Sequence, residues 1–313
     1  MKLLIGYDGS EGSDIAIDEL AREGLPAEAE ALVASVAEVW LPSPNEVPED
    51  VFPPSVPVAV KLAHQRAEQM REEATELAKR GSERVQRIFP GWRVSYEAMC
   101  GSPAFELLNR AAEWKPDLIV VGSEGHTALG RFVLGSVSQK VLTEALTSVR
   151  VGRRPTGSGA SAERIVVGVD GSPGSQVAVK VVAARGWSPG SEVRVVVVYD
   201  PVVNVGIPFM PPGIDELVEA ERTHAEQFAA DAVKELGAGL ADRNVTVSYA
   251  VEPGDPKRLL VRHAEEFGAD CIFTGASGFS NRFERFVLGS VSAAVAARAH
   301  CSVEVVRSPQ DRR

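Results

Sequence analysis

Glycine and serine residues in the first half of the chain have a spacing that could bind phosphate. Gly122 and Gly125 are separated by two residues, and nine more lead to Gly135, which Ser136 follows directly. Free backbone N–H groups and the helix dipole attract anions to the start of a helix, and a serine hydroxyl there can bond a phosphate oxygen. A glycine at a strand end lets the backbone approach a ligand closely, because it has no Cβ. Together these residues indicate a phosphate cradle formed from two places in the chain.

Each of these residues also has an ordinary structural explanation. Glycine is common in the turns that follow strands, and serine is a usual N-cap at the start of a helix. For any one residue alone, the structural explanation is the better one. The set, however, occurs twice, because RFVLGSVS occupies residues 131–138 and returns at 285–292. Two occurrences at corresponding places favour a binding site.

The repeat extends over nearly the whole chain. The segments that match, in the same order in both halves, are MKLLIGYDGSEGS with ERIVVGVDGSPGS, DLIVVGSEG with DCIFTGASG, and TSVRVGRRP with CSVEVVRSP. Internal repeats of this kind indicate a duplicated structural unit. We therefore expect a first domain at 1–152, a linker rich in Gly and Ser at 153–162, and a second domain at 163–308.

Within each half, the sequence pattern alternates between strands and helices. Continuous apolar runs such as LIVVG at 118–122 predict strands that are buried on both faces, and long helices are predicted near 58–87 and 214–238. This alternation predicts a doubly wound parallel α/β sheet of Rossmann-like type in each half. Ligands of such sheets bind beyond the carboxyl ends of the strands, where the strand order reverses. The repeated motifs follow the first and fourth strands, so they are expected at that edge.

The pattern Gly-x2-Gly-x9-Gly-Ser, after an Asp-Gly-Ser on the first strand, resembles the ATP-binding class of the universal stress protein family. The resemblance covers nearly all of both halves and implies two sites for ATP or another adenine nucleotide, with Mg²⁺ accompanying it. Carried over to matching positions, it implies a first site of Asp8, Val36, Gly122, Gly125, Gly135, Ser136, Val137 and Ser138. It implies a second site of Asp170, Val198, Gly275, Gly278, Gly289, Ser290, Val291 and Ser292. The resemblance further implies that each valine of the second strand contacts adenine through its backbone.

The two copies depart from this pattern in different ways. Ten residues separate Gly278 from Gly289 in the second copy, and this longer segment gains Arg282 beside Arg285, which could strengthen phosphate binding. In the first copy, the carboxylate of Glu124 would repel a triphosphate unless a divalent cation lies between them or the side chain turns to solvent. We therefore expect the two sites to differ in affinity.

Asp8 and Asp170 are open to three interpretations. Each carboxylate could cap the following helix, could contact the nucleotide or Mg²⁺, or could act as a general base. No acid–base partner occurs in the matching motifs, and no GxxxxGK[ST] sequence occurs in the chain. We therefore expect a nucleotide-binding regulatory protein and not an enzyme. A slow nucleotide hydrolase and a scaffold with empty sites are the alternatives.

Composition argues against several other classes of protein. The net charge of −10 disfavours binding to nucleic acid or to anionic membranes, which require a basic face. No apolar run has the length of about 18–20 residues that spans a bilayer, and the first residues predict a strand, not a signal peptide. The three cysteines form no CxxC motif, which is typical of a reducing, cytoplasmic setting, and Cys100 is expected to be a small buried residue.

The family resemblance also implies how the two halves assemble. Universal stress proteins commonly pair through their last strands, so the two halves are expected to pair within one chain, around 149–153 and 303–307. A single chain would then resemble a family dimer, and a homodimer of whole chains is a further open outcome.

Overall fold

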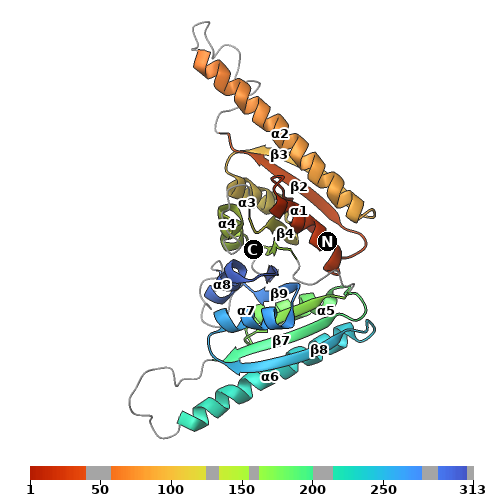
Figure 1. Cartoon of the computed structure of the whole chain (residues 1–313), viewed down its shortest axis with the longest axis vertical. Coiled ribbons are helices and arrows are strands. Elements are labelled where there is room, and N and C mark those ends of the chain that lie inside the picture. Colours follow the sequence, from red (N-terminus) through yellow and green to blue (C-terminus); the bar gives the residue numbers. More distant parts are fainter. Residues whose placement is uncertain (40–57, 125–133, 155–161, 200–213, 277–287, 309–313) are drawn as a thin grey trace.

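The computed structural model describes residues 1–39, 58–124, 134–154, 162–199, 214–276 and 288–308. In this part of the chain, helices cover both faces of one ten-stranded sheet, which runs continuously through both halves (Figure 1). The strand order is β3-β2-β1-β4-β5-β10-β9-β6-β7-β8. Each half therefore has the order 3-2-1-4-5, and the prediction of two doubly wound α/β units in tandem is confirmed.

Apart from the short 3-10 helix η1 of the first half, the described elements of the two halves correspond one to one. Those of the first half are β1 (Lys2–Gly6), α1 (Glu11–Asp18), the short 3-10 helix η1 (Glu19–Arg22), β2 (Glu30–Ala37), α2 (Val58–Ile88), β3 (Arg93–Cys100), α3 (Pro103–Trp114), β4 (Leu118–Gly122), α4 (Ser136–Glu144) and β5 (Ser148–Gly152). Those of the second half are β6 (Arg164–Val169), α5 (Pro173–Ala184), β7 (Glu192–Tyr199), α6 (Ile214–Leu240), β8 (Thr246–Pro253), α7 (Pro256–Phe267), β9 (Cys271–Gly275), α8 (Ser290–Arg298) and β10 (Ser302–Val306).

Helix boundaries follow from local sequence signals. Helices α3 and α7 begin at Pro103 and Pro256, where the missing N–H would have had no partner within the helix. Before α7, the side chain of Asp255 accepts a hydrogen bond from the N–H of Lys257 at 3.0 Å. The same helix ends at Gly268, which adopts the left-handed conformation with a φ of 65°.

Strands pair in parallel within each half and antiparallel where the halves meet. At that junction β5 pairs with β10, and Arg150 lies opposite Glu304. The two halves therefore join through their last strands, as predicted. We call this β5–β10 junction the seam.

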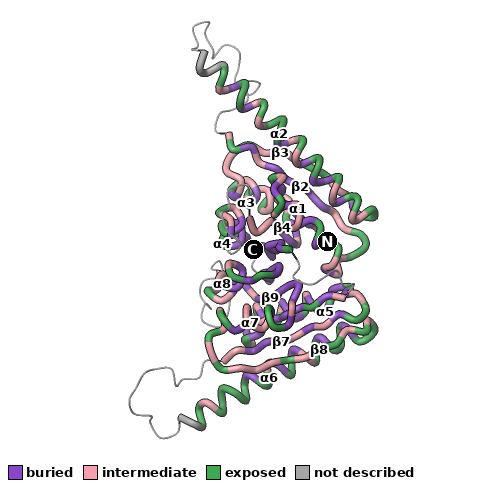
Figure 2. Tube along the Cα trace, in the orientation of Figure 1, coloured by how far each residue is buried: buried purple, intermediate pink, exposed green. Residues whose placement is uncertain are grey.

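Apolar side chains form a different arrangement on each face of the sheet. On the face of α3, α4, α7 and α8, one core spans both halves and includes Val149 of β5 and Val303 of β10. On the opposite face there are two separate cores, one under α1 and α2 and one under α5 and α6. Burial is concentrated in the eight inner strands, whereas the edge strands β3 and β8 and the outer sides of α2 and α6 are more exposed (Figure 2). The seam is thus apolar on only one face.

Candidate functional site

The turn after the first strand of each half is held by an aspartate and a serine. Asp8 Oδ1 accepts hydrogen bonds from the N–H of Ser10 at 3.0 Å and from its hydroxyl at 2.5 Å. Ser10 is the N-cap of α1, and its Oγ accepts from the N–H of Ser13 at 3.3 Å. In the second half, Asp170 Oδ1 accepts from the N–H of Ser172, the N-cap of α5, at 3.0 Å. The serines cap the helices, so the interpretation in which the aspartates do so is wrong; one oxygen of each carboxylate shapes the turn.

Gly122 and Gly275 have a packing role that the sequence analysis did not predict. A Cβ on Gly122 would lie 2.7 Å from the carbonyl carbon of Gly12, in the backbone of α1. A Cβ on Gly275 would lie 2.4 Å from the corresponding atom of Gly174 in α5. The missing side chains therefore let the first turn of a helix rest against the end of the fourth strand.

This packing predicts a large difference between two glycine-to-alanine substitutions. Gly122→Ala should lower the free energy of unfolding by about 1–3 kcal/mol, because the new methyl group meets backbone that cannot move aside. Gly237→Ala, in the last turn of α6 with open space around it, should raise that free energy by up to about 1 kcal/mol. Urea unfolding of both variants measures the two effects. Equal effects of the two substitutions would contradict the packing role of Gly122.

The start of α4 leaves donors for an anion. Gly135 is the N-cap and has no side chain to cap the helix, and its own N–H donates to the carbonyl oxygen of Ser123 at 2.8 Å. The first backbone bond of the helix runs from Gln139 to Gly135, also at 2.8 Å. The N–H groups of the three residues between them, Ser136 to Ser138, therefore precede the helical hydrogen-bond ladder. Helix α8 begins in the same way at Gly289, whose N–H donates to the carbonyl oxygen of Ala276 at 2.7 Å.

The two serines of each motif have different environments. Ser138 is buried, and its hydroxyl donates to the carbonyl oxygen of Gly122 at 2.6 Å. Ser292 makes the equivalent bond to Gly275, also at 2.6 Å. These bonds attach the start of α4 and of α8 to the end of the preceding strand. Ser136, by contrast, is exposed at the first turn.

The backbone of Val36 points beyond the end of β1. Tyr7, just after β1, donates its N–H to the carbonyl oxygen of Ala34 at 2.9 Å, so Ala34 faces β1. Gly101 donates to the carbonyl oxygen of Ala37 at 2.9 Å, so Ala37 faces β3. Backbone groups of successive strand residues alternate between the two neighbours. The N–H and C=O of Val36 are therefore directed to the side where β1 has already ended.

Val198 has the same backbone orientation but a different neighbour. Gly254 donates to the carbonyl oxygen of Tyr199 at 2.9 Å, which turns the backbone of Val198 toward the end of β6. In register with Val198 lies Glu252, whereas Met99 lies in register with Val36.

Glu252 makes the strand edge of the second half polar and charged. It forms an ion pair with Arg262 and lies 3.0 Å from His263 Nε2. The hydrogen bond from Arg262 holds the pKa of the Glu252 carboxyl below its usual range, so this carboxylate stays ionised. The equivalent position in the first half carries the partly buried, apolar side chain of Met99.

The structure brings several of the predicted site residues to one edge of the sheet. Because β2, β1 and β4 are neighbours, Val36, Asp8 and Gly122 lie at or just beyond the ends of adjacent strands, and Ser138 is bonded to Gly122. The second half repeats this arrangement. Gly125, Gly278 and the loop arginines lie outside the described residues, and so does the extra residue of the second copy.

Arginines that the sequence analysis did not single out hold the other ends of these helices. Arg153, just after β5, donates to the carbonyl oxygen of Ala296 in α8 at 2.6 Å. Arg307, just after β10, donates to the carbonyl oxygen of Leu142 in α4 at 2.7 Å. Each helix with a candidate phosphate site is therefore bound at its C-terminal end by the opposite half. The sequence signal that could have pointed to Arg153 and Arg307 is their matching position in the repeated segments TSVRVGRRP and CSVEVVRSP.

The three cysteines are free thiols in different environments. Cys100 is exposed, so the prediction that it is buried is wrong; it ends β3, which is an edge strand. Cys271 and Cys301 are buried, and burial raises the pKa of Cys271 and raises that of Cys301 to about 12. The two buried thiols therefore stay protonated at neutral pH.

The described residues contain neither a cluster of metal ligands nor a helix that could span a membrane. In the described part of the chain, His, Cys, Asp and Glu side chains form no group of three that could hold a metal ion. Over the same residues, none of the helices combines the length and the apolar character needed to cross a bilayer.

Comparison with known proteins identifies the family. A model of the universal stress protein family matches residues 1–151 and again 162–307. The chain belongs to the universal stress protein family. Since the family model matches twice in succession, the chain contains two universal stress protein units in tandem.

Relatives include universal stress proteins of one unit and of two units. A universal stress protein of Thermus aquaticus is 34% identical over 143 residues, which cover 46% of this chain and 91% of that protein. A universal stress protein of Mycolicibacterium smegmatis is 28% identical and covers 97% of this chain and 96% of its own length. The crystal structure of a universal stress protein from Archaeoglobus fulgidus covers 98% of both chains with a TM-score of 0.60 at 20% identity, which shows a shared fold.

Proposed function

We propose that this universal stress protein binds ATP, or another adenine nucleotide, at two sites and acts as a nucleotide-dependent regulator in stress responses. The observation that carries the proposal is the repeated, uncapped start of a helix at Gly135 and Gly289. Both helix starts lie at the edge of the sheet where the strand order reverses, which is the usual ligand site of doubly wound folds. Duplication of the whole arrangement supports one nucleotide site in each half.

The described residues offer complementary groups to each part of a nucleotide. The first N–H groups of α4, at Ser136 and Val137, can donate to phosphate oxygens. The N–H and C=O of Val36 can pair with a ring nitrogen and the exocyclic amine of adenine, which present an acceptor and a donor side by side. Asp8 stands at the end of the strand between these two groups. Mg²⁺, where it accompanies the nucleotide, would take most of its ligands from phosphate and water.

We propose that the two sites differ in affinity, and the described residues supply a reason besides Glu124. The ion pair of Glu252 and Arg262 places charged groups at the edge of the second site, in register with Val198. The first site has the apolar Met99 in this place. An uncharged purine ring packs more favourably against the thioether than against a hydrated ion pair.

The proposal assigns binding, and not turnover, to these sites. Asp8 Oδ1 already accepts two hydrogen bonds within its own turn, so this oxygen is engaged in holding the turn. The proposal also includes a reducing, cytoplasmic setting, which three free cysteines support.

Identification of the bound nucleotide tests the proposal directly. Freshly purified full-length protein is denatured, and the released small molecules are identified by chromatography and mass spectrometry and counted per chain. We expect adenine nucleotide, with up to two equivalents per chain. ADP alone, together with phosphate release from added Mg-ATP, would favour the slow hydrolase. If the protein releases no nucleotide and does not bind Mg-ATP up to millimolar concentration, the proposal fails, and a scaffold with empty sites is the remaining function.

A further inference from the structure

The seam is built around a local twofold axis. Val303, Glu304 and Val305 of β10 lie opposite Val151, Arg150 and Val149 of β5, so the Arg150–Glu304 pair occupies the centre. The same two positions also correspond in the repeat, as the matched segments TSVRVGRRP and CSVEVVRSP show. The axis that relates the halves therefore passes through this pair.

Backbone contacts around this axis obey the symmetry. The N–H of Arg153 donates to Ser302 Oγ at 2.9 Å, and the N–H of Arg307 donates to Ser148 Oγ at 3.1 Å. The two arginine side chains bind opposite helices in the same reciprocal manner. These groups would fit equally well if two identical halves met at the seam.

A second pair of charged residues lies beside the axis at matching positions. The repeat aligns Asp8 with Asp170, and the same spacing aligns Glu23 with Arg185. Contacts agree with this alignment: the N–H of Gly186 donates to the carbonyl oxygen of Gly24 at 2.8 Å, and Arg185 Nη1 donates to the carbonyl oxygen of Glu23 at 2.9 Å.

The charges at these two positions have opposite signs in the two halves. The first half has Arg150 bonded to Glu23, and the second half has Glu304 bonded to Arg185 at 2.7 and 2.9 Å. Across the seam, Arg150 Nη1 lies 3.4 Å from Glu304 Oε2. All four residues are buried; Arg150 is 0% exposed and Glu304 is 2% exposed.

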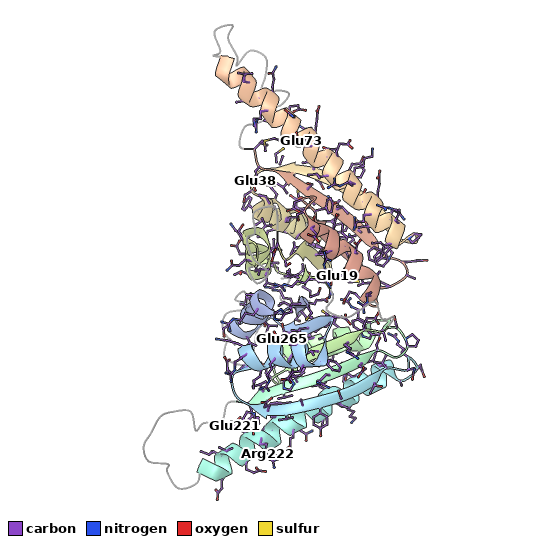
Figure 3. The ribbon with its side chains drawn as sticks, viewed as in Figure 1. Glu19, Glu38, Glu73, Glu221, Arg222 and Glu265 are labelled. Carbon is purple, nitrogen blue, oxygen red and sulfur yellow. The ribbon has the colours of Figure 1, made fainter. Side chains whose placement is uncertain are left out.

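Glu19 adds a contact that only the first half can make. It binds Arg150 Nε at 3.0 Å and accepts a hydrogen bond from the hydroxyl of Ser302, in the second half. The corresponding residue of the second half is Val181. Figure 3 shows Glu19 close to the boundary between the halves.

We infer that this inversion of charge makes the seam selective, so that a first half pairs with a second half and not with a copy of itself. Two first halves would place Arg150 opposite Arg150. Two second halves would place Glu304 opposite Glu304 and Arg185 near Arg185. Buried like charges are strongly unfavourable, and such repulsion is how interfaces reject wrong partners. The partner that fits each terminal strand is therefore the other kind of half.

Variants of the full-length chain in which the buried charges of one half are reversed test this inference. Glu304→Arg with Arg185→Glu gives the second half the charges of the first, and Arg150→Glu with Glu23→Arg does the reverse. Each double variant keeps an opposite-charge pair within the altered half. Because Arg150→Glu would also place a carboxylate beside Glu19, that double variant and the quadruple variant are made in a Glu19→Gln background, with Glu19→Gln alone as their reference. We expect the Tm of each to fall by about 10 °C, with a larger hydrodynamic radius as the seam opens.

The quadruple variant is the decisive comparison. It inverts both halves, so opposite charges face each other again, and we expect it to recover at least half of the lost Tm and the compact radius. A 1:1 mixture of the two double variants, labelled with different mass tags, should form a heterodimer in native mass spectrometry, because each half finds its complement in the other chain. Double variants as stable and compact as the wild type would overturn the inference, and so would a quadruple variant no more stable than they are.

Discussion

The free energy of unfolding of this protein is expected to fall by about 1.4 kcal/mol for each unit of pH between about pH 5 and pH 8. The residue responsible is Glu23, which is buried beside the seam. Burial raises the pKa of its carboxyl to about 8, against the partial compensation by Arg150. In the unfolded chain the same carboxyl has a pKa near its ordinary value of about 4.3.

The direction of the effect follows from proton binding. Between the two pKa values the folded protein holds a proton that the unfolded chain has lost. Stability is therefore fully present below the unfolded pKa and is lost as the pH rises through the folded pKa. Most buried salt bridges of proteins give the opposite trend, because their carboxyls have depressed pKa values.

The arrangement of charges explains why Glu23 retains a proton. Within the part of the chain that the structure describes, the buried carboxylates of Glu19, Glu23 and Glu304 form ion pairs with two guanidinium groups, those of Arg150 and Arg185. If one of the three carboxyls holds a proton, the net charge of these five side chains is zero. Burial raises the pKa of both Glu19 and Glu23, and among the described residues Glu23 Oε2 is in addition buried without a hydrogen-bond partner, so we assign the proton to Glu23.

Urea unfolding at pH values from 5.5 to 8.5 measures this dependence. Glu23→Gln should lower the slope and should be more stable than the wild type at pH 8.5, because an amide needs no proton there. Glu221→Gln replaces an exposed glutamate of α6 and serves as the control, with the slope of the wild type (Figure 3). A wild-type stability that rises with pH over this range would refute the assignment.

Much of the architecture follows from local sequence, because the signals for strands and helices are local. The run LIVVG is apolar throughout, as a strand covered on both faces must be, and it forms β4. The helix predicted near 58–87 is α2, Val58–Ile88, and its apolar residues recur at helical spacing. The pairing of the last strands was predicted from the family resemblance, because no local sequence signal specifies which sheet edges pair.

Other features could not be predicted because they depend on contacts between distant segments. Gly122 has a strand-end position that suits a ligand, but only the packed structure shows α1 backbone in the space of its Cβ. Arg150 interrupts the apolar run SVRVG, a pattern that ordinarily indicates an exposed face. It is buried because β5 becomes a central strand once β10 pairs with it, and carboxylates from η1 and from the other half then surround it.

Substitution of the glycine before each candidate phosphate helix is expected to remove one nucleotide site at a time. Gly135 is half-buried and has a φ of −61° and a ψ of 151°, which other residues adopt without strain. Gly135→Trp can therefore fold, but its indole would lie beside the first N–H groups of α4 and block a phosphate there. We expect affinity at the first site to fall by at least about 100-fold, which corresponds to the loss of two or more charge-assisted hydrogen bonds.

Isothermal titration with Mg-ATP and counts of released nucleotide distinguish the two sites. Gly135→Trp should leave only the site of the second half, and Gly289→Trp only that of the first; the double variant should bind none. Gly237→Trp introduces the same side chain at an open position of α6 and should bind like the wild type. If Gly135→Trp and Gly289→Trp both keep the wild-type stoichiometry and affinity, the phosphates do not bind at the starts of α4 and α8. If only one of them lowers the stoichiometry, a single half carries the nucleotide, and the contrast between Met99 and Glu252 predicts that it is the first.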